Sequence, residues 1–260
     1  MRLLVTRPRE DAAPLAQVLA ARGIETMIEP MIEIVDLPGP LVTRQDIQAI
    51  LFTSVNGVRA LLRRNRGDLA EFTALPVFAV GDATAQAARG AGFRQVESAA
   101  GNVSALAALV LARLTPGSGP LLHVAGSDIA GDLAGRLIAE GFIVNRTALY
   151  SARQATALSA ATGEGLRHNL IDGVTFFSPR TAAAFVTLCR DSGVLPLLRD
   201  VVSLCLSPAV AQAVSGATWR AIIVAPRPDQ DALLGCLGDP ALRSARADAG
   251  SAMLAAREIT

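Results

Sequence analysis

Small hydroxyl side chains at the ends of short apolar runs have the most evident potential for chemistry in this sequence. An amphipathic stretch follows each run, so these residues fall where a strand turns into a helix. A helix N-terminus presents unpaired N–H groups and a partial positive charge, and it can hold a carboxylate or a phosphate. The same residue types are ordinary N-caps, so each one alone favours a cap and the set favours a dual role. The set is Ser54, Thr84, Ser127, Ser178 and Ser207.

Thr84 is the strongest individual candidate for anion binding. It follows Gly81 in the segment Val80-Gly-Asp-Ala-Thr. A glycine at the turn lets a ligand approach the backbone closely. We therefore expect Gly81 and Thr84 to contact a ligand together.

Arg7 and His123 each have two interpretations. The Arg7 guanidinium could bind a ligand carboxylate through two parallel hydrogen bonds, or it could pair with Glu10 or Glu29 of the protein. His123 lies inside an apolar run, which favours a core histidine over a catalytic one.

Composition excludes several classes of protein. All 24 basic residues are Arg, so Schiff-base and Walker-type lysines are excluded. Two His and three Cys without a CxxC pair do not indicate a metal site, and no GxGxxG segment indicates a dinucleotide. A net charge of +1 without a basic stripe argues against nucleic-acid binding. We expect neither metal nor cofactor.

The sequence also predicts a soluble protein without a membrane-spanning segment. The N-terminal apolar run is too short for a signal peptide. The uncharged stretch 201–219 is interrupted by Pro208 and Gly216, which argues against a membrane span. We expect a cytoplasmic protein.

The apolar runs that position these residues do not alternate with polar residues, and each precedes a helix-like stretch. Strands of this kind are typical of parallel sheets covered on both faces. The runs are 3–6, 49–53, 77–80, 121–125, 174–177, 201–206 and 221–224.

The two halves of the chain match at an offset of about 120 residues, which indicates a duplicated domain. Ile50-Leu-Phe-Thr-Ser matches Val174-Thr-Phe-Phe-Ser, Phe78-Ala-Val matches Leu204-Cys-Leu, and Leu3-Leu-Val-Thr matches Leu121-Leu-His-Val.

Two linkers are predicted, at 37–47 and 151–170, from Pro38, Gly39, Pro40, Gly163 and Gly165. Residues 1–36 and 171–260 would then form one discontinuous domain, and 48–150 the other. Two short connections favour a hinge with a cleft between the domains.

Several weak motifs occur in a characteristic order as far as about Leu234. They are Val5-Thr-Arg-Pro, Phe52-Thr-Ser, Val80-Gly-Asp-Ala-Thr-Ala and Phe176-Phe-Ser-Pro, together with Tyr150, the only tyrosine. In this order they resemble the uroporphyrinogen-III synthase family. The resemblance implies two similar three-layer α/β/α domains with parallel sheets (flavodoxin-like), duplicated and segment-swapped and joined by a two-stranded linker.

The resemblance also implies a function and site residues. The family cyclises the linear tetrapyrrole hydroxymethylbilane, with inversion of the terminal pyrrole ring and without a cofactor. Tyr150 aligns with the family's cleft tyrosine, which implies hydrogen bonding to the departing hydroxyl; a strand-end tyrosine with a buried ring is an equal alternative. The implied substrate-binding residues are Arg7, Thr53, Ser54, Gly81, Thr84, Ser127, Ser178 and Ser207.

The segment Ser207-Pro-Ala-Val departs from the family pattern, which often has Gly and Thr there, so only Ser207 and its backbone are carried over. The implied partner is hydroxymethylbilane, handed over by the preceding pathway enzyme, and the implied state is a monomer. A non-catalytic two-domain ligand-binding or sensor protein of the same fold is the alternative.

Overall fold

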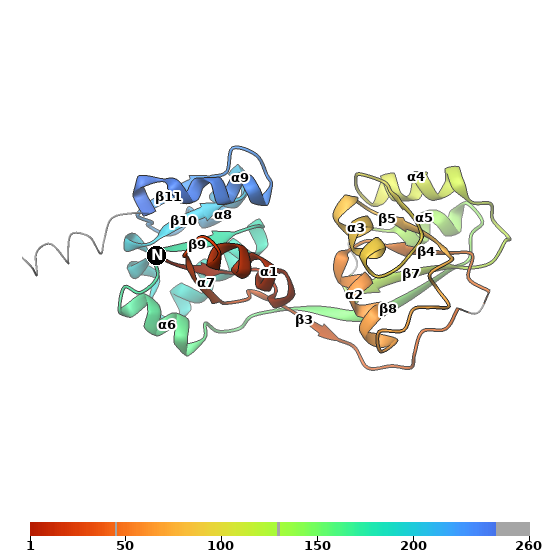
Figure 1. Cartoon of the computed structure of the whole chain (residues 1–260), viewed down its shortest axis with the longest axis horizontal. Coiled ribbons are helices and arrows are strands. Elements are labelled where there is room, and N and C mark those ends of the chain that lie inside the picture. The colour runs from red at the N-terminus through yellow and green to blue at the C-terminus, as the bar shows by residue number, and fades with distance from the viewer. Residues whose placement is uncertain (45, 129–130, 243–260) are drawn as a thin grey trace, which may run out of the picture. The chain divides into compact units, whose positions relative to one another are not determined.

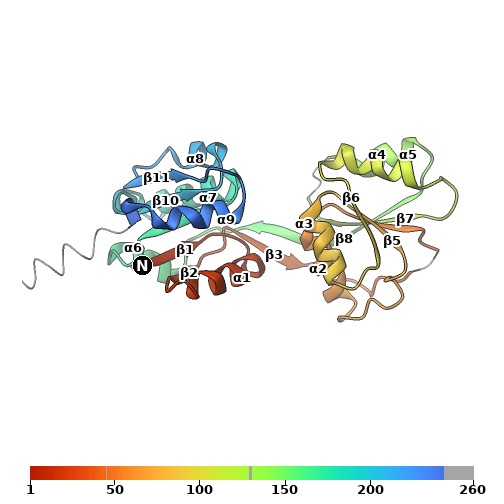
Figure 2. The ribbon, with the colours of Figure 1, turned by 45° about the horizontal axis from the view of Figure 1, so that its top comes forward.

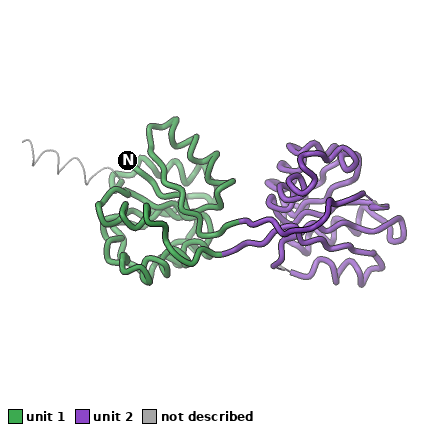
Figure 3. Tube along the Cα trace, turned by 90° about the horizontal axis from the view of Figure 1, so that it is seen from below, with its two compact units in different colours: residues 1–33, 154–260 green, residues 34–153 purple. Residues whose placement is uncertain are grey.

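The computed structural model describes residues 1–44, 46–128 and 131–242 (Figure 1). The chain divides into two compact units (Figure 3). The first unit combines Met1–Glu33 with the segment that begins at Gln154, and the second unit is Ile34–Arg153. The first unit is thus built from both ends of the chain.

The first unit contains a five-stranded sheet in the order β11-β10-β9-β1-β2. All of its strand pairs are parallel. β9 and β10 are buried along their whole length, because helices cover both faces of the sheet. The strands are β1 (Arg2–Val5), β2 (Glu25–Ile28), β9 (Gly173–Phe176), β10 (Val202–Cys205) and β11 (Ala221–Val224).

Helices cover both faces of the sheet of the first unit (Figure 2). Two apolar clusters, one on each face, hold these helices against the strands. On one face Phe176 packs against Phe185 and Trp219. On the other face Leu15 and Leu233 share a cluster with the strand residues. The helices are α1 (Arg9–Ala20), α6 (Ala160–Arg167), α7 (Pro179–Asp191), α8 (Pro208–Val214) and α9 (Gln230–Gly235), with 3₁₀ turns at Leu195–Asp200, Cys236–Gly238 and Pro240–Leu242.

The second unit contains a six-stranded sheet in the order β3-β8-β7-β4-β5-β6. The pairs from β8 to β6 are parallel. β3 is an antiparallel edge strand, because the amide of Leu37 donates to Leu149 while that of Ala155 donates to Met31. The strands are β3 (Ile32–Asp36), β4 (Ala49–Phe52), β5 (Pro76–Ala79), β6 (Gln95–Ser98), β7 (Leu121–Gly126) and β8 (Val144–Gln154).

Helices also cover both faces of the second sheet. Phe52, Leu61 and Phe72 are fully buried in the cluster on one face. Leu51, Leu106 and Leu137 are fully buried in the cluster on the other face. The helices are α2 (Val55–Arg64), α3 (Asp82–Gly90), α4 (Val103–Arg113) and α5 (Leu133–Ala139). Each unit is therefore a three-layer α/β/α sandwich, as predicted.

The predicted linker 151–170 is too long. β8 continues to Gln154, and 160–167 form α6, whose N-cap Ser159 accepts a hydrogen bond from the Thr162 amide at 3.2 Å. The glycines that suggested a linker are buried in this helix. A Cβ on Gly165 would lie 3.0 Å from Ile171, so this glycine permits close packing of the helix.

Within the described residues, no helix is both long and apolar enough to cross a membrane. The three cysteines are free, and burial raises the pKa of Cys189 to about 12, with the charge of Glu29 adding to the effect. The described part of the chain has no group of three or more His, Cys, Asp and Glu side chains placed to hold a metal ion.

Candidate functional site

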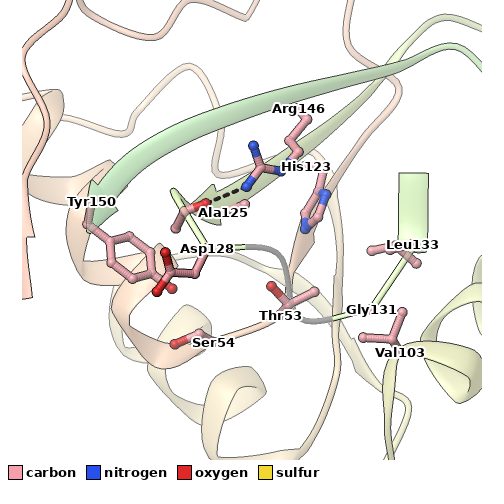
Figure 4. Close-up of a pocket in the computed structure, with 11 residues that line it drawn as sticks. Thr53, Ser54, Val103, His123, Ala125, Asp128, Gly131, Leu133, Arg146 and Tyr150 are labelled. Atoms are coloured by element: carbon pink, nitrogen blue, oxygen red, sulfur yellow. Dashed lines mark hydrogen bonds between the residues drawn. The ribbon is translucent and has the colours of Figure 1, made fainter. Parts of the chain in front are cut away.

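A hollow of about 140 Å³ opens in the second unit near the carboxyl ends of β4 and β7 (Figure 4). Ligands of open α/β sheets usually bind beyond the carboxyl ends of the strands. The described residues that line the hollow are Thr53, Ser54, Val103, His123, Ala125, Gly126, Asp128, Gly131, Leu133, Arg146 and Tyr150.

Tyr150 reaches the hollow because of an irregularity in the sheet. The register between β7 and β8 shifts between Ala125 and Gly126, so that Gly126 becomes the partner of Tyr150. A Cβ on Gly126 would lie 3.0 Å from the tyrosine ring, so the ring occupies space that any other residue would fill. The Ser127 amide donates to the Tyr150 carbonyl at 2.8 Å and fixes the backbone.

The Tyr150 ring is buried, with 8% of the residue exposed. Its hydroxyl makes no hydrogen bond with any residue that the structure describes. A phenol in this position can donate to or accept from a ligand in the hollow.

Thr53 and Ser54 enter the hollow from the turn between β4 and α2. Ser54 is the N-cap of α2, and its hydroxyl accepts a hydrogen bond from the Asn56 amide at 3.0 Å. Ser54 therefore caps α2 and also lines the hollow.

His123 and Arg146 form the polar side of the hollow. They are register partners on β7 and β8, and neighbouring strands place partner side chains on the same face of a sheet. His123 is only 7% exposed, and neither ring nitrogen has a hydrogen-bond partner among the described residues. Such an unsatisfied buried group is uncommon in a folded protein.

Charge and burial keep His123 neutral. Burial, reinforced by the positive charge of Arg146, lowers the pKa of His123 to about 4. Arg146 donates through one nitrogen, Nη2, to the carbonyl oxygens of Gly126 at 2.5 Å and Ser127 at 3.3 Å. Its remaining N–H groups make no hydrogen bond with the described residues, and Asp128 is the one acidic residue in the described lining.

The other candidates of the second unit lie outside this lining. Gly81 is the N-cap of α3, and a Cβ there would meet no atom within 4 Å, so the turn is open. Thr84 lies in the first turn of α3 and is 5% exposed. Ser127 is exposed beside the hollow, but its predicted place at a helix start is wrong, because α5 begins at Leu133 with Asp132 as its N-cap.

Three candidates belong to the first unit. Ser178 and Ser207 are the N-caps of α7 and α8, and they accept hydrogen bonds from the amides of Thr181 at 3.2 Å and Val210 at 3.4 Å. The guanidinium of Arg7 lies 4.4 Å above the Phe177 ring. Its Nη1 also donates to the Gln230 side chain at 3.0 Å.

Glu29, one of the carboxylates considered for Arg7, has other partners. It accepts hydrogen bonds from the Ser159 amide at 2.9 Å and from the hydroxyls of Ser159 and Thr162. These bonds tie β2 to the start of α6 and give the buried carboxylate a structural role.

Sequence reasoning missed Arg146 and Gly126 and assigned His123 to the core. One signal was available for His123. A titratable residue in a strand that is buried on both faces needs a polar partner, and nothing adjacent in the sequence supplied one. Arg146 gave no local signal, because its proximity to His123 depends on strand pairing.

The fold and the hollow together define a two-domain α/β protein with a candidate ligand site at the carboxyl ends of its strands. A family model described as uroporphyrinogen-III synthase HemD matches residues 13–235. The chain belongs to this family.

Two solved structures have a similar fold. Uroporphyrinogen-III synthetase from Helicobacter pylori is 16% identical with a TM-score of 0.58, and the alignment covers 90% of this chain and 97% of that one. A mutant uroporphyrinogen III synthase from the extremely thermophilic bacterium Thermus thermophilus is 19% identical with a TM-score of 0.52, covering 94% and 99%. At these identities the likeness shows the fold. No curated protein sequence matches the chain significantly.

Proposed function

We propose that this protein cyclises hydroxymethylbilane to uroporphyrinogen III in haem biosynthesis, as a hydro-lyase that releases water and inverts the terminal pyrrole ring. The family match over residues 13–235 supports this activity. The observation that carries it at the site is the Tyr150 hydroxyl, which has no partner among the described residues and belongs to a ring that lines the hollow.

The enzyme must control which carbon of the last ring attacks the first ring, because loss of the hydroxyl from the first ring is chemically easy. The first ring loses its hydroxyl as the pyrrole nitrogen supplies electrons, which leaves an electrophilic azafulvene. The substituted carbon of the last ring then attacks to form a spiro intermediate, which reopens and closes in the inverted orientation with loss of a proton. Tyr150 donates a hydrogen bond to the departing oxygen, which leaves as water with the proton that the pyrrole N–H releases as the azafulvene forms. Positioning and electrostatic support supply most of the catalysis.

The substrate is a polyanion, because each pyrrole carries an acetate and a propionate. The helix starts at Ser54, Gly81 and Ser178 offer N–H groups and partial positive charge for these carboxylates. We propose five further substrate contacts, namely Thr53, Thr84, Ser127, Ser207 and Arg7. We also propose a cytoplasmic monomer that receives its substrate from the preceding pathway enzyme.

The test is to incubate the purified protein with freshly made hydroxymethylbilane and identify the porphyrin isomer after oxidation. The expected product is predominantly type III, without added metal or nucleotide. An isomer ratio equal to that of spontaneous closure would instead favour the non-catalytic ligand-binding alternative, since a sensor of this fold has no influence on ring inversion.

A further inference from the structure

The side chain of His123 lines the hollow and has no hydrogen-bond partner among the described residues. Both nitrogens are buried and unsatisfied, although the same ring in water would make two hydrogen bonds. Figure 4 shows the ring beside Thr53 and Arg146 on the wall of the hollow. The position is costly for stability, so a ligand is the natural partner for the imidazole.

The neutral state of His123 defines what that ligand must offer. A neutral imidazole has one nitrogen that accepts a hydrogen bond and one that donates. The positive charge of Arg146 opposes protonation, so His123 is poorly suited to be a second cation for a carboxylate. A ligand with its own N–H donor satisfies the accepting nitrogen.

Arg146 adds a second requirement. Its unused N–H groups favour a carboxylate, because guanidinium binds carboxylates through paired hydrogen bonds. The two residues are register partners on neighbouring strands, which lie about 4.8 Å apart. The ligand must therefore present an N–H donor and a carboxylate a short distance apart.

We propose that His123 and Arg146 form a subsite for one pyrrole ring of the substrate. His123 accepts a hydrogen bond from the ring N–H, and Arg146 binds the acetate or propionate of the same ring. This proposal rests on the proposed function, because the tetrapyrrole supplies both groups. His123 is a positioning residue here, and its role is to orient one ring relative to the Tyr150 hydroxyl.

The test compares His123→Leu and His123→Gln with wild type and with His168→Leu. His168 is the other histidine, and it lies on the surface paired with Glu164, so it provides a matched control. Kinetics with hydroxymethylbilane and thermal melts are measured for all four proteins.

His123→Leu should raise the melting temperature, because it replaces an unsatisfied polar group by an apolar one, while kcat/KM falls about tenfold, mainly through KM. His123→Gln should recover part of the loss, since its amide oxygen accepts a hydrogen bond. His168→Leu should leave kcat/KM within twofold of wild type. Arg146→Gln should also raise KM, and Arg146→Lys should restore part of the affinity.

Opposite changes in stability and activity separate this role from a purely structural one. If His123→Leu keeps kcat/KM within twofold of wild type, the imidazole pairs only with water and the subsite is overturned. Loss of both stability and activity in His123→Leu, with no recovery in His123→Gln, would also overturn it. If wild type itself forms no excess of type III isomer, the proposed function fails, which is a distinct result.

Discussion

The two units differ at one equivalent row of residues that crosses each sheet. In the first unit Val5 on β1 pairs with Ile28 on β2. In the second unit the matching residues are His123 on β7 and Arg146 on β8. Val5 is fully buried in an apolar cluster that includes Ile28, whereas His123 and Arg146 line a hollow. The duplicated sheet therefore supports a closed core in one copy and a candidate site in the other.

The helices that follow β1 and β7 differ as well. In the first unit α1 begins at Arg9, soon after β1, and buries Leu15 and Leu19 in the cluster that contains Val5. In the second unit α5 does not begin until Leu133, although β7 ends at Gly126, and it is the shorter helix. The connection from β7 to α5 is therefore longer than the one from β1 to α1. A fold can thus keep its strand order while one connection changes in length.

The comparison predicts that catalysis depends most strongly on Tyr150, which lines the hollow of the second unit. Tyr150→Phe should lower kcat about 100-fold or more while leaving measurable activity, because a lost donor of this kind costs roughly 3–4 kcal/mol of transition-state stabilisation. Isomer-resolved turnover measurements provide the check, with a thermal melt to show intact folding. Full activity would leave positioning alone as the explanation of catalysis.

The second prediction concerns the pH dependence of stability. His123 has its pKa lowered from 6.5 to about 4 in the folded protein, so the unfolded chain takes up a proton first as the pH falls. The titration of His123 does not change the unfolding free energy above about pH 6.5. Below that pH it lowers the unfolding free energy progressively, by at most about 3 kcal/mol at about pH 4.

Denaturant unfolding of wild type and His123→Leu between pH 7 and 4 would measure this contribution. The difference in unfolding free energy between the two proteins should grow in favour of the variant as the pH falls. A difference that is constant with pH would mean that the pKa of His123 is not lowered by folding. His123 and Val5 would then differ in their surroundings but not in electrostatics.

The third prediction uses the sheet irregularity that is specific to the second unit. Gly126→Ala places a Cβ about 3.0 Å from the Tyr150 ring, so the ring must shift. We expect kcat to fall about tenfold with a stability loss of roughly 1–2 kcal/mol from overpacking. In a Tyr150→Phe background the same change should reduce kcat much less, because the hydroxyl is already absent. Additive losses would show that Gly126 acts through something other than Tyr150.

The sequence predicted the strands and layers well, because apolar runs such as 49–53 and 174–177 must be buried on both faces wherever they lie. It failed in α6, where the glycines permit close packing. Gly165 suggested a linker, but in the structure it lies against Ile171 and allows the helix to pack closely there. It also failed for His123. The burial of that residue was predictable, but the open space beside it depends on where α5 begins and on the pairing of β7 with β8.

The smallest effect is expected at Thr84, which lies outside the described lining of the hollow. Its side chain is 5% exposed in the first turn of α3, so Thr84→Ala should lower the unfolding free energy by about 1 kcal/mol. The backbone N–H groups at the open turn after Gly81 remain available to a carboxylate in the variant, so kcat/KM should change less than threefold. Thermal melts and kinetics on the same preparation separate the two effects. Loss of activity with an unchanged melting temperature would assign Thr84 a direct contact with the substrate, and the candidate site of the second unit would then extend from β7 and β8 to the start of α3.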